Sequence, residues 1–144
     1  SVSGAPVMYE VKNEHIIVPG SVLKTGANEV GISFTAGNSS LNRNDEFLYT
    51  LFVPDRARFA IPCFDQPNLK ARVSLTLQTP LSWKAVANGP LVEHTQSEST
   101  ATYRFGETKP ISTYLIAFAA GVFQTETAMR SGRSMTMYHR ETDA

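Results

Sequence analysis

Apolar and polar residues alternate along many short segments of the chain, which is the pattern of β-strands that bury one face. Val73, Leu75 and Leu77 alternate with polar residues, and positions 101–105 repeat the pattern. Such a strand has one face on a core and one in solvent, as in an antiparallel sheet. Strands are predicted at residues 7–11, 15–18, 28–34, 47–53, 72–78, 83–87, 91–95, 101–105, 113–124 and 135–138.

The spacing of these segments predicts an all-β fold, either a largely antiparallel β-sandwich or saddle-like curved sheets. Most of these short strands follow one another at intervals of roughly eight to twelve residues, separated by turn-forming residues. Residues 113–124 are apolar at both parities, so we expect a central strand covered on both sides. Without crossover helices a parallel α/β fold is excluded, and the lack of linkers or repeats predicts a single β domain over residues 1–144.

At most one short helix is expected. Pro54 is suited to a first helical turn, and Asp55 places a carboxylate at the positive end of the helix dipole. Because Pro62 disfavours helical geometry at the residue before it, the helix is limited to about two turns. A stiff elbow then runs from Pro62 to Pro67, and a pair between Arg58 and Asp65 would hold its register.

Composition and charge narrow the classes of function. The 144 residues are 42% apolar and 18% charged, which is ordinary for a folded globular protein. Thirteen basic residues balance thirteen acidic ones, so the chain has no net positive field to attract the phosphates of a nucleic acid. The longest apolar run, from Tyr114 to Phe123, falls short of the ~20 residues that span a bilayer, so no membrane span is expected. We expect a soluble domain whose compartment, cytoplasm or cell envelope, stays open.

The candidate chemistry is sparse. Only His15, His94 and His139 are present, far apart and without a His-Glu-x-x-His pair, so no metal ligands and no catalytic residues are assigned. Cys63 is the single cysteine; between two prolines it is expected to be a packed free thiol rather than a nucleophile. The residue pattern alone therefore predicts a soluble all-β domain with one stiff elbow, and it does not indicate which reaction, if any, the domain serves.

Three ordered blocks then point to a family. Residues 57–71, ARFAIPCFDQPNLKA, resemble the Ala-Arg-x-x-Phe-Pro-Cys-Phe-Asp-Glu-Pro-x-x-Lys-Ala signature of the N-terminal domain of the aminopeptidase N family of zinc metallopeptidases. Residues 83–89, WKAVANG, resemble its strand ending in Asn-Gly, and residues 109–118, KPISTYLIAF, resemble its Met-Ser-Thr-Tyr-Leu-x-Ala-Phe motif. The resemblance runs from about residue 28 to residue 123.

The resemblance implies a saddle-shaped domain that packs on a thermolysin-like catalytic domain of the same chain. That second domain carries the Gly-Ala-Met-Glu-Asn and His-Glu-x-x-His motifs and the zinc, and the parent enzyme removes N-terminal residues from peptides. The sequence is expected to be a fragment of the N-terminal domain, which binds no zinc and hydrolyses no peptide alone. Arg58, Cys63, Phe64, Asp65 and Pro67 are assigned to structure.

One departure from the family falls at the substrate site. Family members carry Gln-x-Glu or Gln-x-Gln, which help to hold the free amino terminus of the substrate, and these positions fall on Leu51 and Val53. Neither side chain can accept a hydrogen bond. Leu51, Val53 and Pro54 are therefore predicted to form this domain's part of the first substrate pocket wall. Asp55, at the same strand parity, is a weak candidate to replace the lost carboxylate.

Two other functions stay open at this point. The chain could be a non-catalytic β-sandwich module that binds a protein or a glycan and descends from such a peptidase. A free-standing enzyme that uses Cys63 is the third alternative.

Overall fold

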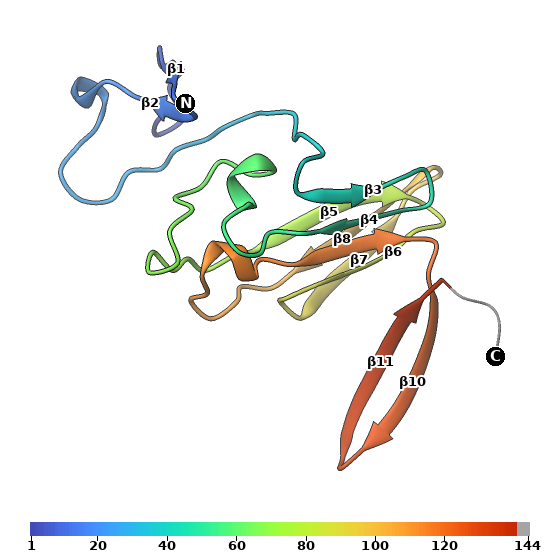
Figure 1. The fold of residues 1–144 in the computed structure, drawn as a ribbon. Helices are drawn as coiled ribbons and strands as arrows, with labels where there is room; N and C mark the ends of the chain where they lie inside the picture. The colour runs from blue at the N-terminus through green and yellow to red at the C-terminus, as the bar shows by residue number, and fades with distance from the viewer. Residues whose placement is uncertain (141–144) are drawn as a thin grey trace. The chain divides into compact units, whose positions relative to one another are not determined.

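The computed structural model describes residues 1–140, and the chain divides into two compact units, residues 1–35 and the part from Ala36 onward (Figure 1). Each unit is described by itself. Within residues 1–140, no helix has the length and apolar content needed to cross a bilayer.

The first unit contains the predicted hairpin. Its strands are β1 (Glu10–Lys12) and β2 (His15–Ile17), which pair antiparallel. The two-residue turn between them places Asn13 and Glu14 at positive φ, 49° and 63°, the conformation that a tight hairpin turn requires. A single turn of 3₁₀ helix, η1 (Gly20–Val22), follows.

The strand predicted at residues 28–34 does not form. The segment makes one isolated bridge, between Val30 and Val2, and its alternating side chains Val30, Ile32 and Phe34 are exposed. Alternation predicts which face a strand would bury, but a strand also needs a ladder partner for its backbone groups. Among residues 1–140 the backbone of this segment bonds only to residues 1–3, and only over residues 29–31, which is too short for a ladder and explains the error.

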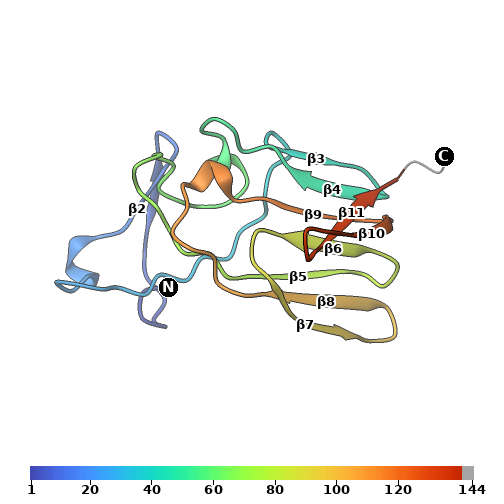
Figure 2. The same cartoon turned by 90° about the horizontal axis from the view of Figure 1, so that it is seen from below.

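The second unit begins with a four-stranded sheet in the order β3-β4-β9-β6, which can be followed in Figure 2. Its strands are β3 (Leu41–Arg43), β4 (Phe47–Thr50), β9 (Phe118–Gly121) and β6 (Lys84–Ala87), and every pair is antiparallel. The predicted strand at 113–124 is central in this sheet, but it is shorter than predicted. Residues Thr113–Leu115 instead form a 3₁₀ turn, η3.

A three-stranded antiparallel sheet in the order β5-β8-β7 completes the body of this unit. Its strands are β5 (Leu75–Pro80), β8 (Thr100–Phe105) and β7 (Leu91–Gln96). The alternation at 101–105 is confirmed, since Ala101, Tyr103 and Phe105 are all buried. The antiparallel all-β prediction therefore holds.

A first core cluster joins the two sheets. Ala85 of β6 and Ala120 of β9 pack with the buried residues of β8, and Trp83 lies against them. Tyr103 donates its hydroxyl to the carbonyl oxygen of Trp83 at 2.7 Å, and burial raises the pKa of this tyrosine above its usual range. Its polar atom is therefore satisfied inside an otherwise apolar cluster.

A second core cluster lies under the elbow. Phe52, Ala57, Ala60 and Ile116 are buried together, and the Phe52 and Phe118 rings meet edge to face at 6.4 Å between centroids. Burying a phenylalanine in this way stabilises the fold by about 1.5–3 kcal/mol. The predicted two-turn helix is only one 3₁₀ turn, η2 (Ala57–Phe59), whose Ala57 supplies the small buried face.

The described chain ends in a two-stranded ribbon that projects from the body (Figure 1). It consists of β10 (Gln124–Arg130) and β11 (Arg133–His139), paired antiparallel along their whole length. Ser131 and Gly132 form its tip at positive φ, 51° and 74°. Sequence analysis predicted a strand at 135–138 but not β10. The polar composition of β10 lacks the apolar alternation by which a strand is recognised.

Candidate functional site

The predicted site residues lie directly after β4. Leu51 and Val53 expose 47% and 65% of their surface, and Pro54 is exposed beside them. Phe52, between them, is 2% exposed and sits in the second core cluster. The backbone N–H of Leu51 donates to the carbonyl oxygen of Ser40 at 2.8 Å, so the segment is held at both its side-chain and backbone groups. Leu51 and Val53 therefore face outward from a fixed backbone.

Asp55 does not share this arrangement. β4 ends at Thr50, and the chain then turns, since the N–H of Arg56 donates to the carbonyl oxygen of Phe52 at 2.9 Å. Strand parity therefore does not extend to residue 55, and the argument for Asp55 as a replacement carboxylate is wrong. Its carboxylate instead lies 3.6 Å from a guanidinium nitrogen of Arg58.

The elbow is anchored by Asp65, whose side chain is 6% exposed. One carboxylate oxygen accepts the backbone N–H of Arg58 at 3.1 Å and lies 3.6 Å from its guanidinium, which confirms the predicted pair. The other oxygen accepts the hydroxyl of Thr113 at 2.6 Å. A nearly buried carboxylate is tolerated here because both of its oxygens have partners.

The same network joins two of the sequence motifs. Ser112 donates its hydroxyl to the carbonyl oxygen of Pro67 at 2.5 Å, next to the bond between Thr113 and Asp65. Both hydroxyl residues lie at the start of η3. Their side-chain hydrogen bonds hold η3 against the elbow. Sequence analysis singled out the 109–118 motif but did not predict that it binds the 57–71 motif.

Cys63 has the environment of a structural thiol. It is half-buried and packs against the second core cluster. Burial and the nearby Asp65 carboxylate raise its pKa from 9.0 to about 11, although the Arg58 guanidinium opposes the shift. A thiol is a nucleophile only when ionised, so this environment opposes the alternative in which Cys63 is catalytic. Phe64 beside it, which the sequence analysis assigned to structure, is 82% exposed.

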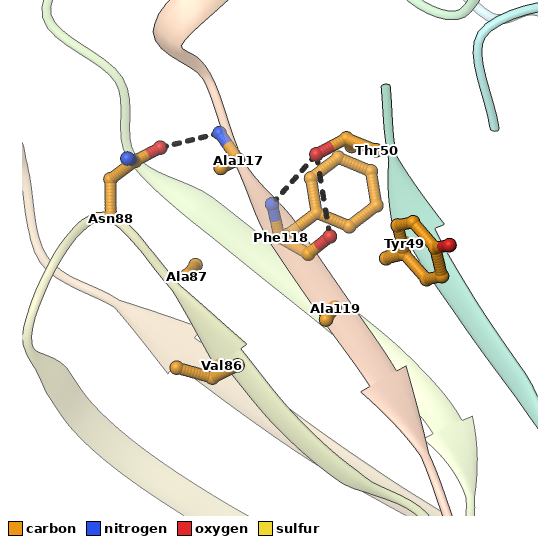
Figure 3. Close-up of a pocket in the computed structure, with 8 residues that line it drawn as sticks. All are labelled: Tyr49, Thr50, Val86, Ala87, Asn88, Ala117, Phe118 and Ala119. Atoms are coloured by element: carbon orange, nitrogen blue, oxygen red, sulfur yellow. Dashed lines mark hydrogen bonds between the residues drawn. The ribbon is translucent and has the colours of Figure 1, made fainter. Parts of the chain in front are cut away.

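A surface pocket of about 320 Å³ opens on the four-stranded sheet beside the site segment (Figure 3). Asn88 accepts the N–H of Ala117 at 2.6 Å, and the Thr50 hydroxyl bridges the backbone N–H and carbonyl of Phe118 at 3.3 and 3.5 Å. Its lining residues are Tyr49, Thr50, Val86, Ala87, Asn88, Ala117, Phe118 and Ala119.

These contacts make the pocket an apolar contact surface. Asn88 and Thr50 use their side-chain oxygen atoms on the backbone, and the Tyr49 hydroxyl accepts a hydrogen bond from the side-chain amide of Asn42 at 2.6 Å. No carboxylate or imidazole is among the described lining residues. Thr50 directly precedes Leu51, so the pocket and the exposed segment follow one another along the chain. Sequence analysis did not predict this pocket, because its small residues indicate only the interior of a strand.

Residues 1–140 contain no group of three or more His, Cys, Asp or Glu side chains that could hold a metal ion. In the second unit, His94 stacks on Tyr103 with 4.3 Å between ring centroids, and His139 lies 3.4 Å from Glu126. The described residues therefore do not fit a zinc site.

Comparison with known proteins supplies the family. The profile of the peptidase M1 N-terminal domain matches residues 10–115, which include the site segment and most of the three motif blocks. The chain belongs to this family.

Relatives of this family member are aminopeptidases by name. A "Probable aminopeptidase 1" of Sulfurisphaera tokodaii is 33% identical over 128 residues, which are 84% of this chain and 16% of the relative. A "Leucyl aminopeptidase" of Saccharolobus solfataricus is 39% identical over 75 residues, 52% of this chain and 10% of the relative. A "Glutamyl aminopeptidase" of Sus scrofa is 37% identical over 87 residues, which are 59% of this chain and 9% of the relative. The chain thus spans a sixth or less of the length of these curated relatives.

Proposed function

We propose that this chain is the N-terminal domain of a zinc-dependent aminopeptidase, with Leu51, Val53 and Pro54 forming part of the wall of its first substrate pocket. The partners are the catalytic domain of the same polypeptide and a peptide substrate. The zinc belongs to that catalytic domain, since residues 1–140 offer no group to hold it. Membership of the peptidase M1 N-terminal domain family carries the proposal.

The geometry of the site segment supports a wall rather than a core role. Leu51 and Val53 are exposed, yet the backbone that carries them is fixed by the buried Phe52 and by the bond to Ser40. A rigid segment with outward side chains is what positions a substrate without ordering cost. Since neither side chain accepts a hydrogen bond, this wall makes apolar contact and does not hold the substrate's ammonium group.

The experiment is hydrolysis of aminoacyl anilides by the full-length protein from which this chain derives. We expect release of the anilide, loss of activity after removal of the metal with a chelator, and recovery when zinc is restored. A well-folded full-length protein that cleaves no anilide or peptide at any metal loading would overturn the proposal. It would favour the alternative, a β-sandwich module that binds a protein or glycan.

A further inference from the structure

The turn before β3 carries the sequence pattern of an N-glycosylation acceptor. Asn38-Ser39-Ser40 has a serine two positions after the asparagine and no proline between them, and no other asparagine of the chain has serine or threonine at that distance. Oligosaccharyltransferases recognise this Asn-x-Ser/Thr pattern in secreted chains. Because so short a pattern also arises by chance, its use requires that Asn38 and Ser40 have compatible surroundings.

Asn38 presents its side-chain amide to solvent. The residue is exposed, and its backbone carbonyl accepts the Leu41 N–H at 3.2 Å, which closes the turn. Its side chain has no hydrogen-bond partner among residues 1–140. The turn leads into β3 at one edge of the four-stranded sheet, so a bulky group on Asn38 displaces no strand. The folded domain can therefore carry a glycan at this position.

Ser40 has the opposite environment, and the fold does not explain its hydroxyl. The residue is 0% exposed, and its hydroxyl oxygen has no hydrogen-bond partner within residues 1–140. Burying a hydroxyl without a partner destabilises a folded protein, so the fold alone favours alanine here. The fold does use the Ser40 carbonyl, which accepts the Leu51 N–H at 2.8 Å, but any residue supplies a carbonyl. A hydroxyl that the folded domain does not use indicates a role before folding.

We propose that Asn38 is an N-glycosylation site and that the Ser40 hydroxyl serves glycan transfer rather than the fold. The donor is an oligosaccharide carried on a polyprenyl diphosphate. The Asn38 side-chain nitrogen forms a bond to the anomeric carbon of the first sugar and releases one proton. The bond from that carbon to the diphosphate oxygen breaks, and the polyprenyl diphosphate leaves. Since Ser40 is fully buried in the folded domain, transfer precedes folding and the chain crosses a membrane unfolded.

Mass spectrometry of the full-length protein isolated from its source cells tests the proposal. We expect the peptide that contains Asn38 to carry a glycan on that residue in most molecules. Finding Asn38 only in its unmodified form would overturn the proposal.

Three variants of the full-length protein, expressed in the same cells, test whether the pattern directs the modification. Asn38→Gln and Ser40→Ala should each lose the glycan. Ser39→Ala is the matched control, because it keeps the Asn-x-Ser pattern, and it should retain the glycan. A glycan that persists on Asn38 in the Ser40→Ala variant would overturn the proposal, because the hydroxyl would then not be needed.

The contribution of the Ser40 hydroxyl to the fold is measured on full-length protein made without glycosylation. Ser40→Ala should leave Tm within about 1 °C or raise it, since it removes a buried hydroxyl that has no partner. A fall of about 4 °C or more would overturn the assigned role of the hydroxyl. These readouts do not use catalysis. An active protein without the glycan refutes this inference alone, and an inactive glycosylated protein refutes the peptidase function alone.

Discussion

At the scale of single residues, Asp65 shows how one side chain joins distant parts of the chain. Its two oxygens bind the backbone of Arg58 and the hydroxyl of Thr113, between which the chain forms the strands β5 to β8. The motif that carries Asp65 is thus explained by contacts rather than by chemistry with a substrate. The site segment inherits its position from this anchor through η2 and Phe52.

Replacing Asp65 by Ala should lower the free energy of unfolding by about 2–4 kcal/mol, since it strands a buried hydroxyl and an N–H without an acceptor. Urea denaturation measures this difference. The matched control is Glu93→Ala, which removes an exposed pair with Arg104 (2.7 Å) and should cost less than about 1 kcal/mol. Similar losses for the two variants would show that Asp65 is not an anchor.

The raised pKa of Cys63 leads to a prediction about how alkylation and stability depend on pH. Because burial raises its pKa from 9.0 to about 11, the ionised fraction at pH 8 is roughly 100-fold lower than in the unfolded chain. Alkylation by iodoacetamide should be slower by about that factor in the folded protein than in urea. The free energy of unfolding should also fall as pH rises from about 9 towards 11, since the unfolded chain releases the proton first. Equal alkylation rates would refute the buried thiol.

At the scale of elements, close approach of backbones limits which residues the turns accept. A Cβ built on Gly89 would lie 2.0 Å from the carbonyl oxygen of Gly106, so the Asn88-Gly89 turn has no room for a side chain. Asn88 meanwhile fixes the neighbouring chain at Ala117. The strand motif that ends in Asn-Gly therefore has a steric and a hydrogen-bonding reason.

Gly89→Ala should reduce the free energy of unfolding by about 2 kcal/mol or more, because backbone must move to admit the methyl group. Gly20→Ala is the control, since nothing lies within 4 Å of its Cβ position, and it should cost less than about 0.5 kcal/mol. Thermal unfolding compares the two. A tolerated Gly89→Ala would contradict the packing of this turn.

Element prediction from the sequence succeeded where a segment's own pattern decides its structure. Strands at 83–87, 91–95 and 101–105 were predicted, because alternation and turn residues are local signals. It failed at 28–34, which has the pattern but pairs with residues 1–3 only over residues 29–31. It also failed at η3, where Ser112 and Thr113 bind the elbow instead of extending a strand. Both failures depend on contacts between residues that are far apart in the sequence. The periodicity of a single segment does not report such contacts.

The candidate site was predictable only in part, for the same reason. The position of Leu51 and Val53 followed from counting back along a motif, and the structure shows that both are exposed. The turn closed by the bond from the Arg56 N–H to the carbonyl oxygen of Phe52 ends strand parity before Asp55. The pocket lined by Tyr49 and Val86 arises only when β4, β9 and β6 assemble. No spacing within one segment reports such an assembly.

At the scale of the whole molecule, the chain belongs to the peptidase M1 N-terminal domain family and spans a sixth or less of the length of the relatives described above. Its described residues supply a rigid outward segment, an apolar pocket and a methionine-bearing ribbon, and they supply no metal ligands as a group. The central claim is that residues 51–54 touch the substrate.

The most direct measurement is the KM of the full-length protein and its Val53→Glu variant for an aminoacyl anilide. The new carboxylate should bind the substrate's ammonium group and lower KM by about 10-fold, the effect of one charge-assisted hydrogen bond. Val92→Glu, at another exposed valine, in β7, should leave KM unchanged. An unchanged KM and kcat in the Val53→Glu variant would contradict the account.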